Sequence, residues 1–182
     1  MMVVLDEPLQ LNAVRLIPIA DKHASERYAS WMNDPEVIRY TEILSGGYDI
    51  PRLHAYIASA QNDPVGAFFA IESETHGHVG NLRIGGISAR HGRATIALLI
   101  GERSVWGRGI GSAAIQLATD FAFRKLHLRK LCAGIYEVNI GSRIAFERAG
   151  YIQEAKLKAH VIYEGRPIDV LQMAKFNGEF AI

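Results

Sequence analysis

The sequence of 182 residues contains one cysteine, Cys132, so an internal disulfide is impossible and nothing points to an oxidising compartment. It also lacks any apolar run near the roughly 20 residues that a membrane span needs. The first seven residues carry acidic side chains where a signal peptide would carry basic ones. We therefore expect a cytoplasmic protein with no membrane partner.

The sequence also lacks a large excess of either charge, since its formal net charge is +1. A near-neutral total gives no sign of nucleic-acid binding, and the basic run at 124–130 is explained by cations at the end of a helix. The two parts of the chain nevertheless differ, with a net charge of −6 over residues 1–75 and +7 over 76–182. Such a division fits an enzyme that binds one cationic and one anionic substrate.

Length and composition indicate one globular domain over 1–182, with 49% hydrophobic residues and no repeat or linker. In the first part of the chain we expect a strand, then a helix, then two helix starts at Asp34-Pro35 and Asp49-Ile-Pro51. Three strands in an antiparallel meander follow. The expected ranges are a strand at 11–19, a helix at 21–31, and strands at 65–71, 78–88 and 94–100.

After Gly109 the apolar period becomes helical, and one face carries Ile110, Ala114, Leu117, Phe121 and Leu126. Next we expect a strand at 130–136, a helix from Asn139 to about Ala149 with Gly150 as its stop, and closing strands at 151–157, 160–163 and 168–176. The order β-α-α-β-β-β-α-β-α-β-β predicts an α/β (α+β) fold. Its mixed sheet is mostly antiparallel, with one strand-helix-strand crossover at 94–136.

Three alternating glycines, Gly107, Gly109 and Gly111, stand between a strand and the long helix. The free N–H groups at a helix start, the helix dipole and Arg108 would together make an anion site. The loop matches neither a P-loop, because no lysine precedes Ser112, nor the Gly-x-Gly-x-x-Gly dinucleotide pattern. By itself it is equally consistent with an ordinary helix start.

The context of this loop adds a resemblance. Gly109 and Gly111 match the two small positions of the Gln/Arg-x-x-Gly-x-Gly/Ala motif in the GNAT superfamily of acyl-CoA N-acetyltransferases. Trp106 replaces the first polar residue, as in the branch resembling RimJ and RimL. The segment 139–151, Asn-x-x-Ser…Phe-x-x-x-Gly-Tyr, is similar to the second family motif, and 31–37 resembles the N-terminal helix region. The resemblance spans about residues 10–176.

A GNAT-like fold implies acetyl-CoA as co-substrate. Its pantetheine would pair with the exposed backbone of a splayed strand at 99–101, its pyrophosphate would lie on 107–112, and a backbone N–H near Leu99 or Ile100 would hold the developing oxyanion. A primary amine would then attack the thioester directly. The residues implied in cofactor binding are Leu99, Ile100, Gly101, Trp106, Gly107, Arg108, Gly109, Ile110, Gly111, Ser112, Asn139, Ser142 and Phe146.

The proton donor to the leaving thiolate is commonly a tyrosine in this superfamily, and that position is Phe146 here. Ser142, one turn earlier, is the candidate catalytic substitute. The alternatives are that Ser142 only belongs to the first turn of a capped helix and that water gives the proton. Glu42 and Asp49 are candidate bases near the expected substrate mouth, although either fits a solvated loop carboxylate.

The branch resemblance suggests a protein N-terminal amine as acceptor. Alternatives are an amino sugar or other small amine, or a non-catalytic acyl-CoA-binding module. No metal is expected, because His76 and His78 lack a third ligand. Trp31, Tyr40, Tyr48 and Phe68 either line an apolar mouth or belong to the core, and the oligomeric state is left open.

Overall fold

A single eight-stranded sheet organises the chain in the computed structural model, which describes residues 7–43 and 46–179. Its order is β1-β2-β3-β4-β5-β6-β8-β7, and all neighbours are antiparallel except β5 and β6. This confirms the expected mixed sheet with one crossover. The strands are β1 (Leu9–Leu11), β2 (Val14–Pro18), β3 (Ala67–Ser73), β4 (Gly77–Ser88), β5 (Arg93–Ile100), β6 (Lys130–Tyr136), β7 (Ile152–Tyr163) and β8 (Arg166–Phe176).

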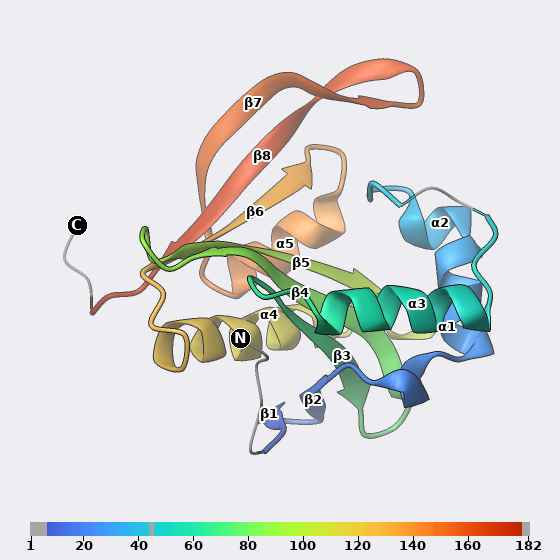
Figure 1. Cartoon of the computed structure of the whole chain (residues 1–182). Helices are drawn as coiled ribbons and strands as arrows, with labels where there is room; N and C mark the ends of the chain where they lie inside the picture. Colours follow the sequence, from blue (N-terminus) through green and yellow to red (C-terminus); the bar gives the residue numbers. More distant parts are fainter. Residues whose placement is uncertain (1–6, 44–45, 180–182) are drawn as a thin grey trace.

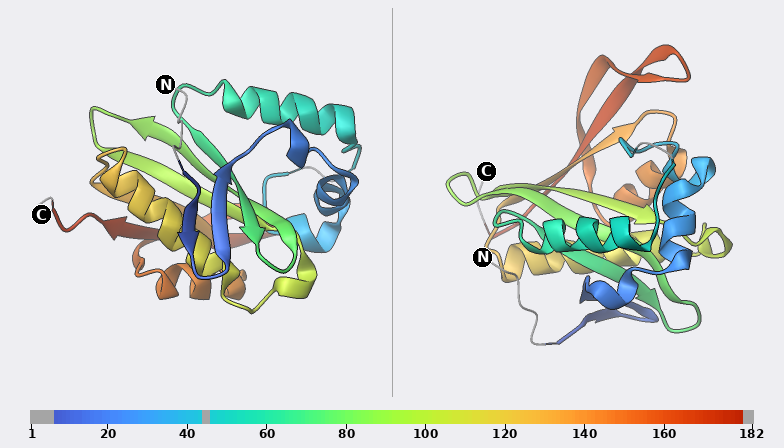
Figure 2. Two further views of the ribbon diagram at one scale, coloured as in Figure 1. Left: turned by 90° about the horizontal axis from the view of Figure 1, so that it is seen from below. Right: turned by 45° about the vertical axis from the view of Figure 1, so that its right-hand side comes forward.

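Helices cover both faces of this sheet (Figures 1 and 2). Two pack on one face and three pack together on the other, while the β7–β8 hairpin projects beyond the rest of the molecule. The first pair is α4 (Ile110–Arg124) and α5 (Ile140–Arg148); the second group is α1 (Glu26–Asn33), α2 (Pro35–Ile38) and α3 (Ile50–Gln61).

The main core lies between α4 and the sheet. The predicted apolar face of α4 is confirmed over four of its five positions, which are all buried. The fifth, Leu126, comes after the helix ends at Arg124. Phe69 of β3 meets Phe121 of α4 edge to face at 5.5 Å between ring centroids. Alternation along β3 turns Phe68 to the opposite face, where it packs on Tyr56 of α3.

Local capping signals fix the helix starts as expected. Asp34 Oδ1 accepts from the N–H of Glu36 at 2.9 Å, and Asp49 Oδ1 accepts from the N–H of Arg52 at 2.8 Å. Gly150 follows the last helix with a φ of +84°, the left-handed conformation that a helix-stop glycine supplies.

Two expectations near the N-terminus were wrong. The segment 11–19 is not one strand: a turn at Asn12, with φ of +52°, joins β1 to β2. Asparagine tolerates this left-handed conformation better than most residues. The segment 21–31 is not one helix, because a 3-10 turn at Asp21–His23 precedes α1. Ser25 starts α1 by accepting from the N–H of Tyr28 at 3.2 Å.

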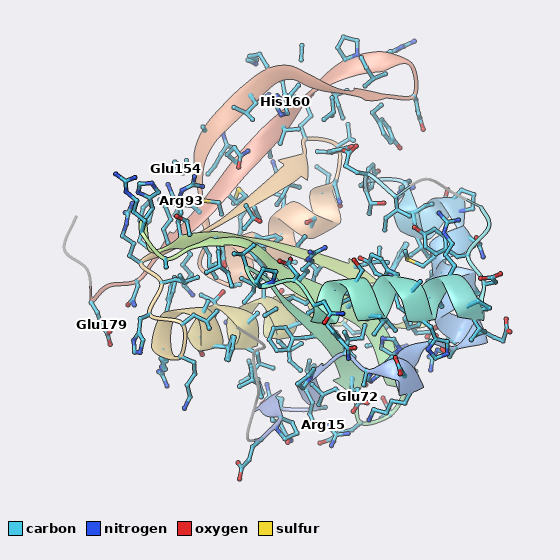
Figure 3. All side chains as sticks on the ribbon, in the orientation of Figure 1. Arg15, Glu72, Arg93, Glu154, His160 and Glu179 are labelled. Carbon is cyan, nitrogen blue, oxygen red and sulfur yellow. The ribbon has the colours of Figure 1, made fainter. Side chains whose placement is uncertain are left out.

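The closing strands also differ from expectation. Segments 151–157 and 160–163 form one strand, β7, which bends at a register shift between Leu157 and Val161. Ala159 lies in this bulge with φ of +47°, and its N–H donates to Asp169 Oδ1 at 2.9 Å. Asp169 also pairs with Lys158 at 2.8 Å. His160 stays exposed on β7 (Figure 3).

An aromatic cluster joins α1 to the beginning of β4. The ring of His78 meets His23 at 5.0 Å, Trp31 at 5.0 Å and Tyr28 at 5.6 Å, each at a steep angle. Trp31 lies so close to Gly101 that a Cβ there would stand 2.1 Å from Trp31 Cδ2. The cluster therefore fixes α1 against the end of β5, where only glycine fits.

Both histidines of this cluster are uncharged in the folded state at neutral pH. Burial lowers the pKa of His78 to about 4, against a hydrogen bond of 3.0 Å with Asn81 Oδ1 that favours the charged form. Burial also lowers the pKa of His23. The nearest carboxylate is Glu72, whose Oε1 lies 3.9 Å from His23 Nε2 but whose other oxygen bonds Arg15 at 3.0 Å (Figure 3).

Acid should therefore weaken the fold through His78. Between pH 6.5 and about 4 the unfolded chain binds a proton at this residue and the folded chain does not, so stability falls as pH falls. The shift corresponds to a loss of roughly 3 kcal/mol by pH 4. We expect His78→Gln to flatten the pH dependence of the unfolding free energy in urea over this window. His160→Gln, at an exposed position, should keep the wild-type slope; equal slopes in all three proteins would contradict the assignment.

Candidate active site

Two parallel strands that separate along their length form the site. β5 and β6 pair only from Arg93↔Lys130 to Thr95↔Cys132. Beyond these pairs β6 turns away from β5 (Figure 1). The divergent parts, 96–100 and 133–136, line a cavity of about 1010 Å³. The edge of β5 is therefore open toward the cavity, where a ligand can add to it as an extra strand does.

The glycine loop closes one end of this cavity. Gly107 and Gly109 have φ values of +76° and +81°, and Gly109 precedes the first turn of α4 without a capping side chain. A Cβ at either glycine would meet no atom within 4 Å, so both face open space. Free N–H groups at the helix start, bordered by this space, fit the pyrophosphate of CoA.

Trp106 ties the loop to the strand. Its indole Nε1–H donates to the Ile100 carbonyl at 2.8 Å, which uses one of the two acceptor positions of this oxygen. The N–H of Gly101 donates to the Val79 carbonyl at 3.0 Å. Gly101 packs beneath Trp31 and lies outside the cavity lining, and the pairing of a ligand with the backbone at 99–101 stays a prediction.

Helix α5 forms the opposite wall. Asn139 Oδ1 accepts from the N–H of Ser142 at 3.1 Å, and this cap places Ser142 in the first turn at the cavity. Phe146, one turn further, is buried and packs edge to face on Tyr151 at 5.0 Å. Phe146 has no proton to give, so Ser142 is the hydroxyl that α5 presents to the cavity.

The other end of the cavity carries Glu42, Tyr40 and Tyr136, and the ring of Tyr163, outside the lining, packs against both tyrosines. Tyr136, the last residue of β6, donates its hydroxyl hydrogen to Glu42 Oε1. The ring centroids of Tyr40 and Tyr163 lie 6.4 Å and 6.3 Å from that of Tyr136. Burial and the bond to Glu42 raise the pKa of Tyr136 to about 12, so its phenol stays protonated.

The structure brings most of the predicted site residues around this one cavity, and their roles remain predictions. The exceptions are Gly101 and Arg108, which is exposed. The lining includes Leu99, Ile100, Trp106, Gly107, Gly109, Ile110, Gly111, Ser112, Asn139, Ser142 and Phe146.

The candidate bases and the candidate aromatic residues differ in whether they line the cavity. Glu42 lines the cavity, whereas Asp49 does not and serves as the cap of α3. Of the four aromatic candidates, only Tyr40 lines the cavity. Trp31 is buried, and Tyr48 and Phe68 pack against the smaller hydrophobic core that α1, α2 and α3 form.

Sequence reasoning missed Tyr136 and Tyr163. Tyr136 ends a strand three residues before the Asn139 motif, a position that could have marked it as cavity-facing. Tyr163 gave no signal, because its approach to the site depends on the bend of β7.

In residues 7–43 and 46–179 no group of three or more histidine, cysteine, aspartate or glutamate side chains could hold a metal ion. Over the same residues no helix has the length and apolar character needed to cross a membrane.

The GNAT family model, described as an acetyltransferase (GNAT) domain, matches residues 13–152. The chain therefore belongs to the GNAT family and is an acetyl-CoA-dependent N-acetyltransferase. The uncharacterized N-acetyltransferase p20 of Bacillus licheniformis is 27% identical to it over 155 residues, which cover 83% of this chain and 86% of the relative.

Two solved structures share the fold. The spermidine N-acetyltransferase of Vibrio cholerae in complex with CoA and spermine matches with a TM-score of 0.80 and 19% identity, covering 91% of this chain and 96% of that one. Mycobacterium smegmatis RimJ in complex with CoA-disulfide matches with a TM-score of 0.81 and 23% identity, covering 97% and 88%. Both likenesses show that this chain has the same fold as these structures.

The glycine loop generates a direct test of CoA binding. A Cβ at Gly111 would make only ordinary contacts, 3.5 Å from Leu98 Cδ1 and 3.8 Å from Ala145 Cβ, so alanine fits there. Gly111→Trp should fill the space between β5 and α5, and Gly109→Trp should fill the cradle. We expect both to weaken acetyl-CoA binding about tenfold or more, as loss of charge-assisted hydrogen bonds does.

Calorimetric titration with acetyl-CoA measures this effect, with circular dichroism to verify folding. Gly111→Ala is the matched control and should bind within about threefold of wild type. Unchanged affinity in both tryptophan variants would remove the loop from the cofactor site.

Proposed function

We propose that this enzyme transfers the acetyl group to a primary amine by direct attack, and that the α-amine of a protein N-terminus is its acceptor. The observation that supports this is the continuity of the cavity. One space borders the free start of α4 at one end and the Glu42–Tyr136 pair at the other. A donor and an amine can therefore meet beside β5 without a covalent enzyme intermediate.

Acetyl-CoA supplies an acetyl group activated as a thioester. The ammonium first loses one proton, and the amine nitrogen then attacks the carbonyl carbon. A C–N bond forms, the C–S bond breaks, and the nitrogen gives up its second proton. One proton goes to the leaving thiolate and the other to solvent, so the products are the amide, free CoA thiol and H⁺. Positioning of the two reactants supplies much of the acceleration.

The hydroxyl of Ser142 is the proposed proton donor to the thiolate. It lines the cavity in the first turn of α5, held there by the Asn139 cap. The buried ring of Phe146 occupies the position at which the family pattern carries a tyrosine. A thiol is an easy leaving group near neutral pH, so the demand on this donor is modest.

An acetyl-CoA assay with thiol detection tests the proposed acceptor. The amine panel should include peptides with free N-termini, nucleotide-linked amino sugars and polyamines. We expect peptides with a free α-amine to release thiol, and the same peptides blocked by formylation to release none. Turnover with amino sugars alone would overturn the peptide assignment and establish a small-amine acetyltransferase.

Replacement of the proposed proton donor should lower turnover without disturbing binding. For Ser142→Ala we expect kcat to fall roughly tenfold to hundredfold, at the low end for a general acid because the leaving group is a thiol. Adding Phe146→Tyr to this variant should restore part of the rate, since it returns a phenol to the position in the family pattern. The role must be abandoned if Ser142→Ala keeps near-wild-type kcat across the pH range.

A further inference from the structure

We propose that Glu42 binds the acceptor through a single ammonium and that the site selects a primary monoamine with an otherwise neutral body. This inference rests on the proposed function and names the charge of its substrate. The motivating feature is the acceptor cluster, defined as Glu42, Tyr40, Tyr136 and Tyr163. Its members come from the segment after α2, the end of β6 and the end of β7.

Glu42 is the one carboxylate of the cavity lining without a cationic partner, among the residues that the structure describes. The lining holds two carboxylates, Glu36 and Glu42. Glu36 bonds Arg39 at 3.0 Å, so its charge is already compensated. Glu42 is exposed, and its one hydrogen bond within residues 7–43 and 46–179 is from the neutral phenol of Tyr136. One negative charge is therefore available to an incoming ammonium.

Two acidic side chains outside the lining, Glu137 and Asp169, are compensated as well, and a third, Glu164, interacts with Tyr163 outside the lining. Lys156 lies 2.9 Å from both Glu137 and Asp169, and Lys158 lies 2.8 Å from Asp169. These contacts hold the pKa of Glu137 and of Asp169 below the usual range. At Glu137 or Asp169 a second ammonium would have to displace a lysine.

The aromatic faces of the cluster also disfavour a second cation. The guanidinium of Arg39 lies 4.7 Å from the centroid of the Tyr40 ring and occupies the face on which an ammonium would stack. Arg148 also lines the cavity and adds positive charge. The ring of Tyr136, which lines the cavity, can still contact an apolar or amide-bearing body.

Tyr136 positions the carboxylate and does not take part in proton transfer. Because its phenol stays protonated to about pH 12, it donates one hydrogen bond to Glu42 throughout the working range. This bond fixes one oxygen of Glu42 and leaves the other for the ammonium. When the ammonium gives its first proton to Glu42, the carboxylic acid releases that proton to solvent at the cavity mouth.

The test compares substrates and variants. The substrates are an alanine-initiated peptide amide without other charges, phenethylamine as a small monoamine, and spermidine. Wild type should show the highest kcat/KM with one of the two monoamines, and which one it is distinguishes a peptide from a small-molecule source. Glu42→Gln should raise the KM for that monoamine about tenfold or more, the size expected for a lost charge-assisted hydrogen bond.

Two further variants separate positioning from general damage. Tyr136→Phe should raise KM severalfold, and its effect should largely disappear in the Glu42→Gln background, because both act through one carboxylate. Glu74→Gln, an exposed change in the turn after β3, is the matched control and should keep wild-type KM. A higher kcat/KM for spermidine than for both monoamines, or equal KM values for Glu42→Gln and Glu74→Gln, would overturn the inference.

A binding measurement keeps this inference distinct from the proposed function. If no amine releases thiol, the proposed function fails, yet calorimetric titration of the CoA-bound protein with each monoamine still measures acceptor affinity. Weaker monoamine binding by Glu42→Gln supports the inference even then. Equal affinity in wild type and Glu42→Gln, or no measurable monoamine binding by either, contradicts it.

Discussion

The separation of β5 from β6 is the constraint on which the site depends. A parallel pair normally continues its hydrogen bonds, and unpaired backbone groups in an interior are costly. Here pairing stops at Thr95↔Cys132, and the exposed edge of β5 borders a cavity instead of a strand. Trp106 satisfies one freed carbonyl, that of Ile100, and in doing so brings the glycine loop to the strand. In the proposed mechanism, donor and acceptor both meet at this one edge.

The structure shows how acidic side chains in the first part of the chain are engaged. Several acidic residues of the first part are engaged locally: Asp34 and Asp49 cap helices, Glu72 pairs with Arg15, and Asp63 pairs with Arg83. These four side chains are therefore already occupied and do not offer a free charge to an amine. In the proposal above, Glu42 supplies that charge at the acceptor end of the cavity.

Interactions between neighbours in sequence were predictable, and interactions between distant residues were not. The cap at Asn139 and the stop at Gly150 follow from residue type and position, so the helix between them could be placed. Tyr136 and Glu42 are 94 positions apart, and no periodicity relates them. The bend at Ala159 was likewise hidden, because it depends on Asp169 across the hairpin rather than on a local turn signal.

The two ends of the cavity are built by different parts of the chain. The loop before α4 and the first turn of α5 border the proposed donor end, while the segment after α2 and the end of β6 border the proposed acceptor end. The acceptor residues can therefore change without altering the cradle at Gly109. Function resides in the site and not in the fold, so a shared sheet does not fix the residues at this end of the cavity. In this chain the acceptor end is defined by one uncompensated carboxylate held by one protonated phenol.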